Sequence, residues 1–85
     1  MYQPTESLTA HNAETALQAG LQAIAAGQRE IDLALLGSVD SAAVATLLAW
    51  KRAAVEQGAS LTFHHMPATL HSLATLYGVD ELLER

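Results

Sequence analysis

Apolar and polar residues follow two different spacings along this chain, and the two spacings predict helices and strands in turn. Apolar residues recur every three or four positions between residues 10 and 24, which is the spacing of one face of an amphipathic helix. The run Ile31 to Leu36 is apolar except for one charge and predicts a buried strand. Helical spacing returns from Val44 to about Gln57, and Ser60 to His64 then alternate polar and apolar residues, which is typical of a half-buried strand.

Residues that start and stop helices mark where these elements should begin and end. Ser7 and Thr9 are candidate caps for the first helix, and Gly27 and Gly58 should end the first and second helices. Pro67 suits the first position of a third helix. The inner face of that helix should carry Leu70, Leu73, Ala74 and Tyr77; Gly78 should end it, and Asp80 should cap a last turn whose Leu82 and Leu83 fold onto the core.

The resulting order is short strand, helix, strand, helix, strand, helix and short helix, which predicts a layered α/β domain. The unit from Ile31 through Phe63 should form a right-handed crossover between parallel strands. Met1 to Glu6 can supply at most one short strand, and Pro4 should place it at an edge because proline cannot donate to a ladder. Eighty-five residues are enough for one domain, with boundaries at residues 1 and 85.

Composition and charge exclude several classes of function. The net charge is −5 with four Lys and Arg residues, so the chain lacks the basic footprint of a nucleic-acid-binding protein and is not suited to an anionic membrane surface. It contains no cysteine and no apolar run of the roughly 20 residues that span a membrane. We therefore expect a cytoplasmic protein without membrane insertion, and the acidic balance favours a protein partner.

Catalytic, cofactor and metal sites find little support in the sequence. His64 and His65 should point to opposite faces of a strand and cannot hold one ion as an ordinary strand pair, while His71 follows six positions later. Ser41 has no histidine placed to act as its base, and no glycine-rich phosphate loop is present. Asp32 is a conceivable acid or base, but such a residue more often sits hydrogen-bonded at a strand edge. We expect no enzyme, no cofactor and no metal.

One corner nevertheless carries more polar groups than a helix start requires. Ser38, Asp40 and Ser41 crowd the point where the strand from Ile31 should pass into the second helix, and ligand sites in α/β folds lie at such carboxyl ends. Ordinary capping needs only one of these side chains. Trp50, the one tryptophan, is either part of the core edge or a partner contact.

This same stretch resembles the signature of STAS domains, the sulfate-transporter and anti-sigma-factor-antagonist family. The family pattern is an apolar strand ending D-L-S-x-V, two further residues, then D-S-x-G and an apolar helix, and Asp32-Leu33 and Val39-Asp40-Ser41 match it. The segments L-A-W-K-R-A-A-V-E-Q-G-A-S-L-T-F and L-Y-G-V-D-E-L-L are similar to one branch, the small stand-alone STAS subunit of the Mla phospholipid-transport ABC system.

The resemblance implies a STAS-type single layer of mostly parallel sheet packed by helices, with a shortened N-terminal strand region. It makes Ser41 the phospho-acceptor or the centre of a partner surface, with Ser38, Asp40 and Ala42 around it. The implied partner is the ATPase subunit of an ABC transporter, met at the inner-membrane face. The alternative is an anti-sigma-factor antagonist that meets an anti-sigma-factor kinase and is switched by phosphorylation of Ser41.

Two departures from the family pattern affect these implications. Ala43 stands where the pattern has glycine, which argues against kinase-type phosphorylation of the preceding serine, and Ala34 replaces the serine after D-L. The short N-terminal region should also leave a sheet edge unpaired, and such an edge predicts a homodimer.

Overall fold

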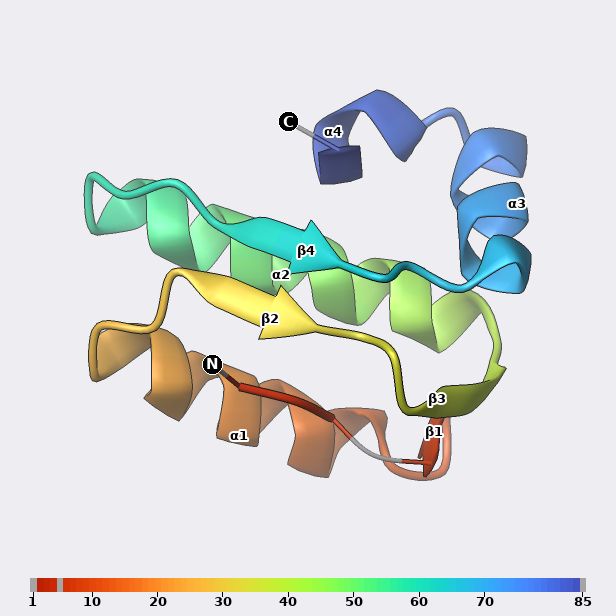
Figure 1. Cartoon of the computed structure of the whole chain (residues 1–85), viewed down its shortest axis with the longest axis horizontal. Helices are drawn as coiled ribbons and strands as arrows, with labels where there is room; N and C mark the ends of the chain where they lie inside the picture. The colour runs from red at the N-terminus through yellow and green to blue at the C-terminus, as the bar shows by residue number, and fades with distance from the viewer. Residues whose placement is uncertain (1, 5, 85) are drawn as a thin grey trace.

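The computed structural model describes residues 2–4 and 6–84 and confirms an α/β architecture in which strands and helices alternate (Figure 1). Met1 and Thr5 of the expected N-terminal strand, and Arg85 of the expected last turn, lie outside the described residues. The elements are β1 Glu6–Leu8, α1 Ala13–Ala25, β2 Glu30–Asp32, β3 Leu36–Val39, α2 Ser41–Glu56, β4 Thr62–His64, α3 Ala68–Leu76 and α4 Asp80–Glu84.

All strand pairs are parallel in the described part of the chain, as the resemblance implies, but the layer is divided into two short sheets. β2 pairs with β4, and β1 pairs with β3 in a register that shifts between Glu6 and Ser7. A parallel bridge joins Tyr2 to Ile31, and the Asp32 N–H donates to the Tyr2 carbonyl at 2.9 Å. The N-terminal segment therefore runs beside the chain that leads through β2 and β3. The homodimer expected through an open edge stays a prediction.

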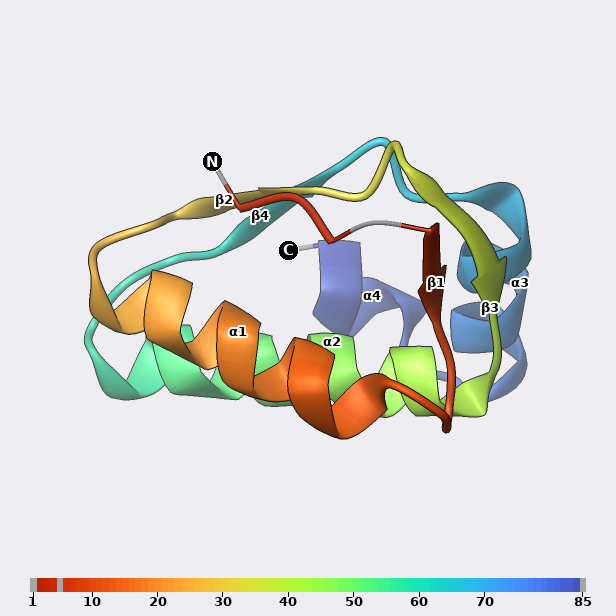
Figure 2. The same ribbon diagram turned by 90° about the horizontal axis from the view of Figure 1, so that it is seen from below.

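Helices cover one face of the β2–β4 pair and leave the other open (Figure 2). α1 and α2 lie beneath the strands, whereas α3 and α4 lie beyond β4, and no helix of the described chain covers the opposite face. Because side chains alternate along a strand, Ile31 points into the core while Glu30 and Asp32 point to the open face. The core is apolar and draws on every helix.

The expected continuous strand from Ile31 to Leu36 is wrong, because a turn divides it. The Asp32 carboxylate accepts the Ala34 N–H at 2.9 Å, and the Leu36 N–H donates to the Leu33 carbonyl at 3.1 Å. A hydrogen bond from a nearby backbone N–H to an aspartate side chain is a common way to form a turn without glycine or proline. Gly37 and Ser38, which follow the expected strand, instead lie within β3.

The first helix begins later than the apolar spacing predicts. Ser7 lies in β1, and Asn12 rather than Ser7 or Thr9 occupies the cap position before α1. The Asn12 side chain is not used as a helix cap: its oxygen accepts the Thr9 N–H at 2.9 Å, and its amide donates to the Ser7 carbonyl at 2.8 Å. These bonds hold a tight turn between β1 and α1, which removes residues 10–12 from the helix.

Gly20 and Trp50 fix how α1 packs on α2. Trp50 is fully buried, which places it in the core, and its indole N–H donates to the Leu17 carbonyl at 3.1 Å. A Cβ at Gly20 would lie 2.2 Å from the Trp50 ring, so only glycine allows this approach. The glycine that the helical pattern treats as an interruption is therefore required by the contact between the two helices.

The C-terminal elements differ from expectation in three side chains. Pro67 is the residue before α3 and not its first residue. Tyr77, expected on the inner face, is 52% exposed, and of the two leucines expected on the core only Leu83 is buried, while Leu82 is 46% exposed. A five-residue helix can turn only part of its surface inward, so Leu82 is left facing out.

Candidate functional site

The polar corner singled out in the sequence is the junction between β3 and α2. Asp40 has extended backbone geometry (φ −138°, ψ −167°) and is the N-cap of α2, and its Oδ1 accepts the Ala42 N–H at 2.8 Å. The Ala43 N–H donates to the Asp40 carbonyl at 3.0 Å. A single residue thus satisfies two of the backbone donors that a helix start leaves without partners.

Asp40 also joins this corner to the turn between β1 and α1. Its second oxygen, Oδ2, accepts the Ala10 N–H from the turn before α1 at 3.1 Å. Both carboxylate oxygens are therefore engaged in internal hydrogen bonds. The sequence pattern did not predict this bond, because Ala10 is 30 residues away and offers only its backbone. Asp40 works as a structural tie that fixes the positions of its neighbours.

The neighbours of Asp40 present hydroxyl groups to solvent. Ser41 is the first residue of α2 and is exposed, and Ser38 is exposed on β3, where it pairs with Ser7. Ala42 is half-buried beside them. The four residues expected around the corner, Ser38, Asp40, Ser41 and Ala42, are neighbours in the sequence and span the end of β3 and the start of α2.

The electrostatics of the corner are unfavourable to a phosphate on Ser41. A helix N-terminus attracts anions through its free N–H groups. Here the Ala42 and Ala43 N–H groups already donate to Asp40, and the Asp40 carboxylate stands beside the hydroxyl. Ala43 is fully buried in the core, so its methyl group fills the place that the family pattern leaves to a glycine. Two of the N–H groups that could hold an anion at this helix start are therefore already engaged by Asp40.

Three histidines make carboxylate pairs away from this corner. His64 Nε2 lies 2.7 Å from Glu30, His65 Nδ1 lies 3.0 Å from Asp32, and His71 Nδ1 lies 2.7 Å from Glu84. The expected opposite orientation of His64 and His65 is wrong: β4 ends at His64, His65 has φ 58°, and both pair with acids two positions apart on β2. Among the residues that the structure describes, no group of three or more ligands is placed to hold a metal ion.

Asp32 holds the turn after β2 and pairs with His65. The Ala34 N–H and then the His65 ring lower the pKa of its carboxyl below the ordinary value. A lowered pKa keeps this group ionised, which suits a hydrogen-bond acceptor and not a general acid at neutral pH.

In residues 2–4 and 6–84, no helix has the length and apolar character needed to cross a membrane.

Comparison with known families accounts for the chain as a whole. A family model described as "Mlab, STAS domain" matches residues 5–84, which include the β3–α2 corner and every helix of the described chain. No curated protein is a significant match. The parallel strands, the alternating helices and the D-S pair at the start of α2 agree with this family, and the chain therefore belongs to the STAS domain family.

Proposed function

We propose that this chain is a non-enzymatic accessory subunit of a phospholipid-transport ABC complex and that it binds the cytoplasmic ATPase through the Asp40-Ser41 corner. Membership of the STAS family supports a role in protein interaction, and the "Mlab" description of the matching model supports the transport setting. The chain itself would sit on the cytoplasmic side of the inner membrane, held there by its partner. The lipid would move through other subunits.

One observation carries this proposal: Ser41 is exposed at a corner whose charged residue is already used internally. Both Asp40 oxygens hold backbone N–H groups, so the corner is held in place before any partner arrives. A preorganised surface loses less conformational entropy on binding than a mobile one. The exposed hydroxyls of Ser38 and Ser41 can then donate hydrogen bonds to a partner and accept hydrogen bonds from it.

The test is co-purification of the chain with the ATPase subunit of an Mla-type transporter. We expect a stable complex with the native chain and its loss with Ser41→Arg, because the long charged side chain would stand in the contact. Ser60→Arg is the matched control, since Ser60 is also exposed but lies after the far end of α2. A complex that survives Ser41→Arg unchanged would rule out this surface.

The exposure of Ser41 also keeps a second function in view, that of an anti-sigma-factor antagonist switched by phosphorylation. A kinase can reach the hydroxyl, and phosphate would add about −1.5 to −2 charges beside Asp40. Incubation with ATP and anti-sigma-factor kinases, followed by intact mass measurement, tests this function. A native chain that gains a phosphate, with none added to Ser41→Ala, would favour it over the transport role.

A further inference from the structure

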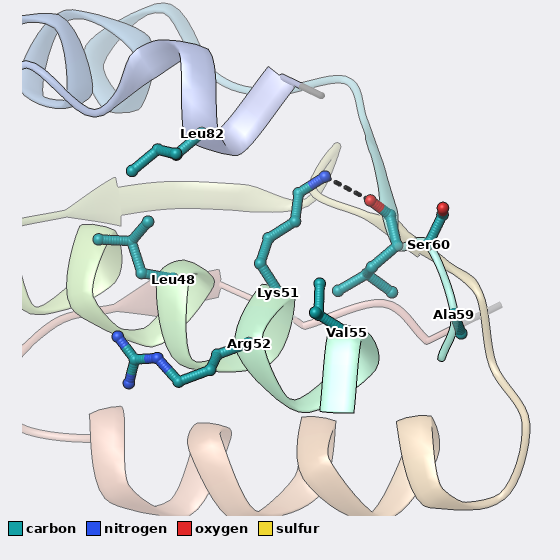
Figure 3. Close-up of a pocket in the computed structure, with 8 residues that line it drawn as sticks. Leu48, Lys51, Arg52, Val55, Ala59, Ser60 and Leu82 are labelled. Carbon is teal, nitrogen blue, oxygen red and sulfur yellow. Dashed lines mark hydrogen bonds between the residues drawn. The ribbon is translucent and has the colours of Figure 1, made fainter. Parts of the chain in front are cut away.

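A groove runs along the C-terminal half of α2, at the opposite end of this helix from Ser41 (Figure 3). It lies between α2, the chain entering β4, and α4, and it has a volume of about 400 Å³. We call it the α2–α4 groove; the residues that line it are Leu48, Lys51, Arg52, Val55, Ala59, Ser60, Leu61 and Leu82. From Ser41 to Val55 the helix rises by about 20 Å, so the groove is separate from the proposed ATPase surface.

The floor and walls of the groove are apolar. Leu61 is buried at its base and Leu48 is half-buried. Val55 of α2 and Leu82 of α4 also line the groove, on either side of the Lys51 side chain in Figure 3, and remain 69% and 46% exposed. Large aliphatic side chains gathered in one hollow, and left in contact with water, are typical of a binding surface.

The charge of the groove is opposite to that of the protein. Lys51 and Arg52 line it and are two of the four Lys and Arg residues of a chain whose net charge is −5. None of the described residues that line it is acidic. The positive side chains therefore stand at an apolar hollow on an otherwise acidic molecule, which is complementary to an apolar ligand with an anionic head.

The two cations have different roles in this geometry. The Lys51 ammonium donates to the Leu61 carbonyl and lies 5.2 Å from the centre of the Phe63 ring, so it is held at the β4 side of the groove. Arg52 is exposed one residue further along α2, and within residues 2–4 and 6–84 no carboxylate forms an ion pair with it. Its planar guanidinium can bind a carboxylate through two parallel hydrogen bonds.

We propose that the α2–α4 groove binds a single-chain fatty acid, with the carboxylate on Arg52 and the acyl chain laid over the apolar side chains that line the groove from Leu48 and Leu82 to Val55. A cavity of about 150 Å³ holds one benzene ring, so the volume of this groove suits on the order of a dozen or more carbons. That is room for one acyl chain and not for the two chains of a phospholipid. The carboxylate would meet the cations, and the chain would cover the exposed leucine and valine.

Titration of the ¹⁵N-labelled protein with dodecanoate, below the concentration at which it forms micelles, tests this proposal by NMR. We expect saturable shifts at Leu48, Val55 and Leu82, with no comparable change at Ser41. Dodecyltrimethylammonium carries the same chain with the opposite charge, and we expect it to bind at least tenfold more weakly. Equal binding of the two amphiphiles, or the absence of saturable shifts, would overturn the proposal.

Variants at exposed positions distinguish binding of the ligand's carboxylate from binding of its acyl chain. Arg52→Gln should weaken dodecanoate binding about tenfold, the effect of losing a hydrogen bond to a charged group. Val55→Asp should abolish it. Arg29→Gln removes the same charge outside the groove and should leave affinity unchanged. If Arg29→Gln weakens binding as much as Arg52→Gln, attraction by net charge accounts for the effect and the site is wrong. Binding of the ATPase by Arg52→Gln, measured in parallel, keeps this outcome distinct from the Ser41 surface.

Discussion

The two ends of α2 carry surfaces of opposite character, one polar and one apolar. At the N-terminal end, Asp40 uses both oxygens on backbone N–H groups and leaves only short, neutral side chains in contact with solvent. At the C-terminal half, aliphatic side chains remain exposed around two cations. The difference shows that one helix can carry a polar surface held by internal hydrogen bonds and an apolar surface that is still uncovered. Trp50 lies between the two and holds the helix in the core.

Removal of Trp50 should have the largest effect on both ends at once. The side chain is fully buried, packs edge-on against Tyr2 with ring centres 5.7 Å apart, and bonds to the Leu17 carbonyl. Trp50→Ala should lower the free energy of unfolding by about 3–5 kcal/mol. Urea denaturation followed by circular dichroism measures this loss. A change below about 1 kcal/mol would contradict the packing of α1 on α2 described above.

Gly20→Ala should be destabilising although alanine is normally the better helix residue. The added Cβ would lie 2.2 Å from the buried Trp50 ring, and overpacking of this kind costs about 1–3 kcal/mol. Helix propensity alone would change stability by about 1 kcal/mol in the opposite direction, so the sign of the change decides between the two effects. In a Trp50→Leu background the added Cβ no longer meets the indole ring, so Gly20→Ala should cost much less there than in the native chain. A double-mutant cycle measures this coupling.

Replacement of Asp40 should weaken the N-terminal end of α2 selectively. Asp40→Ala removes a helix cap and the bond to Ala10, and we expect a loss of about 2 kcal/mol. Asp40→Asn keeps one oxygen for the Ala42 N–H but cannot accept from Ala10 as well, so its loss should be smaller. Denaturant midpoints of both variants test this order. Equal stability of Asp40→Ala and the native chain would show that the tie is not formed.

The smallest expected effect is on how the free energy of unfolding depends on pH in the acidic range, through Asp32. Because the folded-state pKa of Asp32 is lowered, its ionised form stabilises the native state above the unfolded-state value of about 3.9, and this contribution disappears as pH falls through the lower folded-state pKa. Asp32→Asn should therefore reduce stability at pH 7 and lose this deficit at strongly acidic pH. Urea unfolding at both pH values measures the difference, with Glu81→Gln as an exposed control. A deficit that persists at acidic pH would contradict this linkage.

The sequence predicted the order of the elements, except that it merged β2 and β3 into one strand, and it predicted the position of the α2 corner; both depend on local patterns. Apolar spacing located the helices, and Asp40 is one of the residues that caps favour. The turn after Asp32 was missed because Leu33, Leu35 and Leu36 read as one apolar run, although Leu35 is 52% exposed. Such a turn is formed by one side-chain oxygen and leaves no glycine or proline signal.

Contacts between distant segments could not be predicted from the sequence, for a different reason. The need for Gly20 becomes visible only when Trp50 is placed against it, 30 residues later. The orientation of His65 depends on a positive φ that non-glycine residues seldom adopt. The α2–α4 groove is lined by two helices and by the loop that joins α2 to β4, so no contiguous motif marks it.

We propose that the N-terminal end of α2, and not its C-terminal half, contacts the ATPase. Hydrogen exchange measured by mass spectrometry, on the chain alone and in complex with the ATPase, tests it most directly. We expect the complex to slow exchange in the peptide covering residues 38–45 and to leave residues 55–61 unchanged. Protection confined to residues 55–61, with none at the Asp40-Ser41 corner, would contradict it.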